Sequence, residues 1–103
     1  MGQSVQQQPV FAVSYSVATA TPTYVDTMAL PFPLAVSALP GGGGTMAVAY
    51  STTPGAAGNP GGATWFDWPS GAVASATNDV LLSPSTALRF TAATAAGTVE
   101  VVA

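Results

Sequence analysis

The chain has 103 residues, the length of one domain, and its charged side chains are one arginine and four carboxylates, for a net charge of −3. A single cation cannot neutralise the phosphates that nucleic-acid binding requires, nor hold an anionic membrane surface, so we expect neither partner. Without His, Lys or Cys, the chain lacks the bases and nucleophiles of the common covalent mechanisms, and it can form no disulfide. We therefore expect no enzyme and no cofactor.

The first nine residues predict a flexible polar arm. Residues 1–9 are rich in Gln and offer little to bury, so we expect the arm to order only when a partner captures it. The stretch has neither a basic segment nor an apolar one, so we expect no secretory signal and synthesis in the host cytoplasm. The arm residues that we expect to contact a partner are Gln6, Gln7, Gln8 and Pro9.

The remainder, 10–103, predicts one all-β domain built from short strands. Residues 10–19 and 45–53 alternate apolar and small polar side chains with a period of two, as half-buried strands do. Residues 23–30 predict another strand, and 34–39 predict an edge strand or a helical turn. Turn signals recur every 8–12 residues, which is typical of a small antiparallel β-sandwich or barrel. A jelly roll and an immunoglobulin-like Greek key both fit this pattern.

Two stretches rich in Gly predict loops. The run "GGGG" at 41–44 is not followed by Lys, and Met46 stands where a dinucleotide-binding motif needs its third Gly, so we expect no phosphate site. Its composition is typical of a flexible loop. The stretch "PGAAGNPGG" at 54–62 predicts a longer Gly/Pro-rich loop with nothing to anchor a core.

The C-terminal residues 86–103 predict a β-hairpin. Leu88 and Phe90 share one face of the first strand, and Val99 and Val101 share one face of the returning strand. If both faces are buried side by side, a connection of two or four residues is needed within "TAAG" at 94–97. This register places Arg89 opposite or diagonal to Glu100 on the outer face, as a surface ion pair.

The segment "TWFDWPSG" at 64–71 carries both tryptophans of the chain. In a flat strand Trp65 faces one side, while Phe66 and Trp68 face the other, so the three rings cannot all be core unless a bulge or turn reorients one. Core packing, a protein interface and a glycan site all remain open, because the same rings serve each purpose. We take Trp65, Phe66 and Trp68 as the candidate partner interface.

The acidic residues give weak signals for chemistry. A two-carboxylate hydrolase needs a positioned pair, and the sequence distinguishes none. Asn78 and Asp79 could supply oxygen ligands to calcium, but no D-x-D spacing is present and Asn-Asp is first a turn former. We therefore predict no metal site.

The last quarter of the chain, "DVLLSPSTALRFTAATAAGTVEVVA" at 79–103, resembles the ending of small virion proteins of tailed bacteriophages and prophages. In these proteins an "ALRFTA"-type strand turns through a Gly-containing loop into a "TVEVV"-type strand. The resemblance implies a structural role in a virion, as a capsid decoration or cement protein, a head fibre or a tail component, usually as a symmetric oligomer. It carries over no catalytic residue, and the loop at 54–62 departs from the pattern.

The composition points the same way. Hydrophobic residues make up 49% of the chain and charged residues 5%, against about 25% charged in ordinary domains. Such a surface repels copies of itself weakly and is stable in water when other subunits cover it. We expect a homo-oligomer, favouring a trimer, that binds the major capsid protein or other virion proteins. A tail or fibre component and a carbohydrate-binding β-sandwich are the alternatives.

Overall fold

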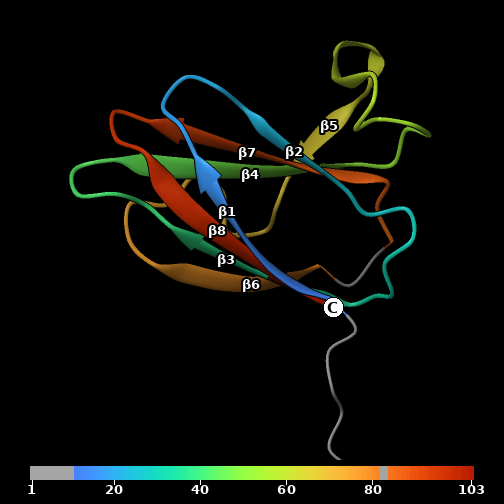
Figure 1. Ribbon diagram of the computed structural model, residues 1–103, viewed down its shortest axis with the longest axis horizontal. Coiled ribbons are helices and arrows are strands. Elements are labelled where there is room, and N and C mark those ends of the chain that lie inside the picture. The colour runs from blue at the N-terminus through green and yellow to red at the C-terminus, as the bar shows by residue number, and fades with distance from the viewer. Residues whose placement is uncertain (1–10, 82–83) are drawn as a thin grey trace, which may run out of the picture.

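A computed structural model of the chain describes residues 11–81 and 84–103, which fold as two antiparallel four-stranded sheets packed face to face (Figure 1). In the described ranges there is one short 3₁₀ turn, η1 (Pro60–Gly62), and no helix long and apolar enough to cross a membrane. The strands in chain order are β1 (Ala12–Val17), β2 (Thr23–Asp26), β3 (Leu34–Leu39), β4 (Thr45–Ser51), β5 (Trp65–Asp67), β6 (Thr77–Leu81), β7 (Ala87–Ala93) and β8 (Gly97–Val102).

The strand order is that of a jelly roll. The first sheet runs β1-β8-β3-β6 and the second runs β2-β7-β4-β5. Strand β1 pairs with β8, β2 with β7, β3 with β6 and β4 with β5, so the chain folds back on itself like a doubled ribbon. The predicted all-β sandwich is therefore confirmed, and of its two topologies the jelly roll is the one formed. The sandwich is open at its edges and is not a closed barrel.

Alternation of side chains builds the core between the sheets. Along β3, and along β8 from Val99 to Val102, every second residue is buried, so the residues between them face outward. The inward faces of the two sheets meet in one hydrophobic cluster. Its members are Val17, Val25, Leu34, Val36, Ala38, Met46, Val48, Trp68, Leu81, Leu88, Phe90, Ala92, Val99 and Val101.

The predicted C-terminal hairpin is wrong. Strand β7 pairs with β2 and β4, whereas β8 pairs with β1 and β3, so the two consecutive strands lie in different sheets. Both predicted buried faces are indeed buried, but they meet across the core and not side by side. Arg89 and Glu100 consequently lie on opposite outer faces, and the expected ion pair between them is not formed.

Two other segments differ from their predictions, and a third is not tested. Residues 34–39 form the interior strand β3, with a neighbour on each side, and neither an edge strand nor a helical turn. The run 41–44 is a packed turn, because the Gly44 N–H donates to the Gly41 carbonyl at 2.9 Å and a Cβ on Gly41 would collide with the Ala96 carbonyl. The predicted arm, 1–9, lies outside the described residues.

Candidate interaction surface

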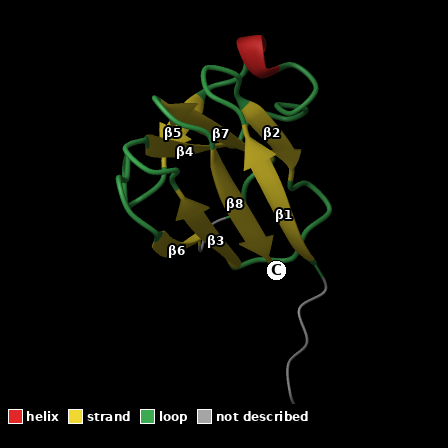
Figure 2. Cartoon of the chain, turned by 60° about the vertical axis from the view of Figure 1, so that its left-hand side comes forward, coloured by secondary structure: helices red, strands yellow, loops and turns green. Residues whose placement is uncertain are grey.

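The aromatic segment forms β5, the short edge strand of the second sheet. Trp65, Phe66 and Asp67 pair with β4 through Ser51, Tyr50 and Ala49, respectively. Alternation places Trp65 and Asp67 on the outer face of the sheet and turns Phe66 to the other side. Figure 2 shows β5 at the end of the sandwich that also carries η1 and one end of β2.

Trp68 belongs to the core. Its side chain is 2% exposed, and its indole N–H donates to the Gly71 carbonyl across the turn that follows. Its backbone N–H donates to the Val48 carbonyl at 3.0 Å, which fixes the residue against β4. The prediction of Trp68 as a partner contact is thus wrong, since a ring sealed in the core has no surface to offer. The core alternative, which the sequence left open, holds for this residue.

The Trp65 side chain covers part of the outer face of the second sheet. The Arg89 guanidinium carbon is 4.9 Å from the centroid of the Trp65 ring, a cation–π contact, and the Tyr24 ring is 5.7 Å away. The indole N–H donates to the Pro60 carbonyl at 3.1 Å. Ser51 and its partner on β7, Ala87, also face outward, yet both are fully buried. Residues on an outer face are buried only when other side chains cover them.

The Gly/Pro-rich loop supplies the rest of this cover. Ala56 is 1% exposed, so the expectation that the loop anchors no core is wrong at this position. The Thr86 hydroxyl lies 2.6 Å from the Thr53 carbonyl oxygen, to which it donates, and 3.1 Å from the Ser51 carbonyl oxygen. The Thr64 N–H donates to the Thr53 hydroxyl at 3.1 Å. The loop is therefore fixed over the second sheet at both of its ends.

Phe66 is the aromatic side chain of this segment that remains open. It is 47% exposed, and its ring lies 5.7 Å from the ring of Tyr50, which packs against the core. Tyr24, whose ring contacts Trp65 on the outer face, is also exposed. We call Tyr24, Trp65 and Phe66 the aromatic edge. Tyr24 and Trp65 meet on the outer face of the second sheet, whereas Phe66 projects to the other side of β5, so the two open rings lie on different faces around Trp65. Exposed aromatic rings are common in contact surfaces.

The charges near the aromatic edge are few and separated. Tyr24, Arg89, Ala49 and Asp67 occupy one row across β2, β7, β4 and β5. Two strand spacings therefore separate Arg89 from Asp67, about 10 Å, so their attraction is largely screened in physiological salt. The four carboxylates of the chain lie on four different strands. Among the described residues, no group of three or more His, Cys or acidic side chains could hold a metal ion.

Asn78 and Asp79 do not converge on a common ligand position. As neighbours in β6 they project to opposite faces, and Asn78 donates to the Ser37 hydroxyl at 2.9 Å. The Ser70 hydroxyl and the Val80 N–H both donate to the Asp79 carboxylate, and these bonds hold the pKa of Asp79 below its ordinary value. Both side chains thus have protein partners.

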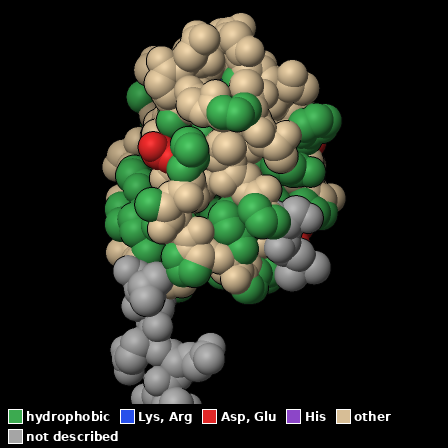
Figure 3. All heavy atoms as spheres, turned by 90° about the vertical axis from the view of Figure 1, so that its right-hand side faces the viewer, with side chains coloured by type: hydrophobic (Ala, Val, Ile, Leu, Met, Phe, Trp, Pro, Cys, Tyr) green, Lys and Arg blue, Asp and Glu red, His purple; other side chains and the backbone are tan. Residues whose placement is uncertain are grey.

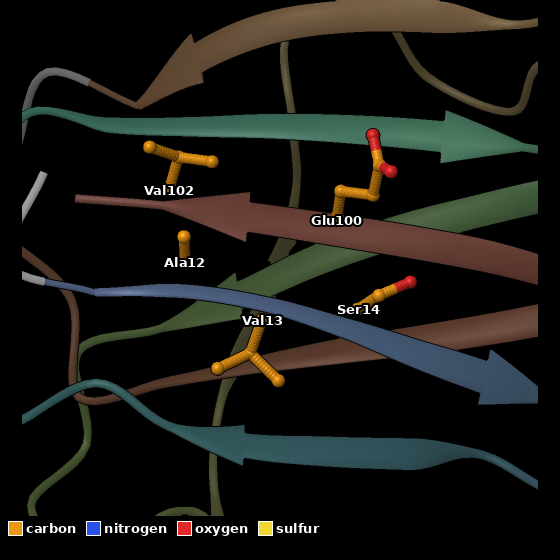
Figure 4. Close-up of a pocket in the computed structure, with 5 residues that line it drawn as sticks. All are labelled: Ala12, Val13, Ser14, Glu100 and Val102. Atoms are coloured by element: carbon orange, nitrogen blue, oxygen red, sulfur yellow. The ribbon is translucent and has the colours of Figure 1, made fainter.

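A hollow that the sequence analysis missed lies on the outer face of the first sheet. It has a volume of about 300 Å³ and is lined by Ala12, Val13, Ser14, Glu100 and Val102 from β1 and β8 (Figure 4). The small side chains of Ala12 and Ser14 leave this space between larger neighbours. The sequence did contain an indication of this hollow, because Ala12 and Ser14 are small and alternate with larger residues in the first strand.

Comparisons with protein-family models, with curated proteins and with solved structures gave no match. The geometry alone therefore decides which predicted site residues stand together. Trp65 and Phe66 lie at one edge, Trp68 does not, and the arm residues Gln6 to Pro9 fall outside the described part of the chain. Tyr24 of β2 and Arg89 of β7 both contact Trp65 across the outer face. No local pattern pointed to them, because the contacts join strands that are far apart in the sequence.

Proposed function

We propose that this chain is a non-enzymatic structural subunit of a bacteriophage particle, and that it decorates or cements the capsid shell. The observation that carries the proposal is the surface of the sandwich, where large apolar side chains are exposed and charges are scarce. Figure 3 shows one face of the molecule on which hydrophobic side chains lie among other side chains and backbone, with few acidic atoms. Within residues 11–81 and 84–103, the exposed large apolar residues are Val13, Tyr24, Met28, Phe66, Val80 and Val102.

The physics of such a surface favours permanent cover by other subunits. Removing exposed apolar surface from water lowers the free energy by about 25 cal/mol per Å². Charges that would keep copies apart are few, so association meets little electrostatic opposition. In an assembled capsid shell, neighbouring subunits keep such surfaces covered.

Fold and resemblance agree with this role without establishing it. Jelly rolls occur in viral capsid domains and also in lectins, so the architecture alone does not select a function. The C-terminal resemblance to phage virion proteins favours the viral branch. The proposed partner is the major capsid protein, the proposed contacts are the aromatic edge and the arm from Gln6 to Pro9, and the proposed assembly is a homotrimer on the shell.

The carbohydrate-binding alternative is less well supported by the geometry. A sugar ring stacks on an aromatic face that is free, and the Trp65 ring is already contacted by Arg89 and Tyr24. Its indole N–H is also taken by Pro60. Phe66 remains open but has no hydrogen-bonding group of its own, whereas sugar hydroxyls need convergent polar partners.

The test compares purified particles of the phage that encodes this chain, made with and without it. We expect labelled antibody to decorate the capsid shell of complete particles, and particles without the chain to rupture at a lower temperature. A double variant, Tyr24→Ala with Phe66→Ala, should reduce shell occupancy at least tenfold. Met28→Ala is the control, because Met28 is the most exposed large apolar side chain in the described part of the chain and lies outside the aromatic edge.

Three outcomes would overturn parts of the proposal. Label confined to the tail or fibres would replace the decoration role by that alternative. Complete absence from purified particles would contradict the virion role altogether. Binding to a glycan array that is lost in Phe66→Ala, together with that absence, would favour a carbohydrate-binding module.

A further inference from the structure

The four edge strands of the sandwich differ in how well they resist pairing with another chain. Strands β2 and β5 are short, with four and three residues; Pro22 directly precedes β2, and Pro69 lies two residues beyond the end of β5. On β6 the Asp79 carboxylate accepts the Val80 N–H at 2.8 Å, a group that an added strand would otherwise bond. Short length, prolines and charged side chains are the usual protections of a sheet edge.

Strand β1 has none of these protections. It runs for six residues, "AVSYSV", with no proline and no charged side chain. It forms one edge of the first sheet, next to β8. A long, neutral, regular edge is the kind that pairs with another strand.

The hydrogen-bond pattern shows which groups of β1 face the open side. Phe11 and Ala103 exchange both backbone hydrogen bonds, at 3.1 and 2.8 Å. In an antiparallel pair such residues alternate with unbonded ones, so Val13, Tyr15 and Val17 bond to β8. The N–H and C=O groups of the alternate residues therefore point away from β8, and none of these groups makes another backbone bond within the described ranges. These residues are Ala12, Ser14 and Ser16.

The side chains along this edge suit a close approach. Ala12, Ser14 and Ser16 are small and project from the outer face, and Ala12 and Ser14 line the hollow in Figure 4. Val13 belongs to the inward set yet is 37% exposed, because the sandwich is open at this edge. Tyr15, two residues on, is partly buried and packs against the core. Apolar atoms are thus left at the edge that a neighbouring strand would cover.

We propose that the free edge of β1 pairs in antiparallel fashion with β1 of a second copy of this chain, about a two-fold axis at Ser14. In this register each Ala12 bonds to Ser16 of the second copy and the two Ser14 residues bond each other. Because every facing residue offers one donor and one acceptor, all outward groups of the three residues are satisfied. Each Val13 then lies opposite Tyr15 of the second copy, which buries its exposed atoms.

A second copy fits this edge better than a charged partner. The edge is neutral, so nothing steers a charged segment toward it. The nearest charge on the outer face is Glu100, which lies opposite Ser14 on β8. In the joined sheet the two Glu100 side chains are three strand spacings apart, about 14 Å, which exceeds the Debye length in physiological salt. Like charges therefore do not oppose the pairing.

The inference rests on the proposed function, since it names one contact between copies of a structural subunit. A two-fold contact would link trimers to each other and would not itself build a trimer. The β1 pairing can be absent while the chain still occupies a phage particle. The particle assay described above measures that occupancy independently of the pairing.

The first test uses single cysteines in a chain that has none of its own. Ser14 and Ser37 both project from the outer face in the same row, on either side of Glu100, but only Ser14 lies on the edge strand. Bonded residues of an antiparallel pair have Cα atoms about 5.5 Å apart, within disulfide range. Under mild oxidation, Ser14→Cys should form disulfide-linked dimers at least tenfold faster than Ser37→Cys. Equal rates would overturn the proposal.

The second test is Ser14→Pro. Because the Ser14 N–H faces outward, proline removes a bond to the second copy and none to β8. The dimer dissociation constant from sedimentation velocity should rise at least tenfold, with a melting temperature near that of the parent chain. An unchanged dissociation constant, or a parent chain that stays monomeric throughout, would refute the pairing. If the proline variant does not fold, the comparison of Ser14→Cys with Ser37→Cys still decides.

Discussion

Trp65 and Trp68 lie three residues apart and have different roles. Trp65 lies on the outer face of the second sheet beneath Arg89, whereas Trp68 follows the end of β5 and enters the core. The sequence correctly indicated that the aromatic side chains of this segment would divide between two faces. It did not show which ring would be sealed, because that depends on the turn that carries the Gly71 carbonyl to the Trp68 indole.

Replacing Trp68 should cost far more stability than replacing Phe66. Trp68→Ala removes the largest fully buried side chain and should lower the free energy of unfolding by about 3–5 kcal/mol. Phe66→Ala, at a half-exposed position, should cost at most about 1 kcal/mol. Urea denaturation followed by circular dichroism measures both. Equal losses of unfolding free energy in the two variants would show that the assignment of Trp68 to the core and of Phe66 to the surface is incorrect.

Asp79 should make the stability of the protein depend on acid. Hydrogen bonds from Ser70 and from the Val80 N–H lower the pKa of Asp79 in the folded state. A lowered pKa means that its contribution is present above the unfolded-state pKa and is lost as the pH falls through the folded-state pKa, below about pH 4. Carboxyl titration by nuclear magnetic resonance should show Ser70→Ala moving the pKa of Asp79 upward. No movement would mean that the Ser70 bond does not form in solution.

At the scale of elements, the crossing from β7 to β8 determines the topology. A hairpin and a crossing between sheets require the same alternation, because Leu88 and Val99 are buried in either case. Local sequence therefore predicted which faces are buried and could not predict which sheet each strand joins. Strand β3 shows the same limit, since its alternation fits an edge or an interior strand equally well.

Gly97 marks the start of β8, where the two sheets approach each other. A Cβ at Gly97 would lie 2.6 Å from the Met46 sulfur and 2.8 Å from the Leu39 carbonyl oxygen, both too close. We expect Gly97→Ala to lower the free energy of unfolding by about 1–3 kcal/mol through overpacking. Gly42→Ala is the matched control, with nothing within 4 Å of its Cβ, and should change stability by less than about 0.5 kcal/mol. Thermal unfolding of both variants tests this, and a neutral Gly97→Ala would contradict the close approach.

At the scale of the whole molecule, apolar contact and hydrogen bonding dominate how copies meet. One arginine and four carboxylates, spread over both sheets, provide no charged surface for ionic assembly. We predict that raising sodium chloride from about 0.05 to 0.5 M leaves self-association unchanged, because screening removes only ionic attraction. Ammonium sulfate should strengthen association, since it favours burial of apolar surface. Light scattering measures the average mass of the assemblies. A fall in that mass on adding sodium chloride would contradict this prediction.

The most direct measurement is the mass of the chain in solution by sedimentation velocity over a wide concentration range. If the exposed apolar side chains and the free β1 edge exist to be covered by other subunits, the average mass should rise with concentration from one chain to dimers and larger assemblies. A single species with the mass of one chain, soluble and unchanged at the highest concentration, would contradict the assignment of this protein as an assembly subunit.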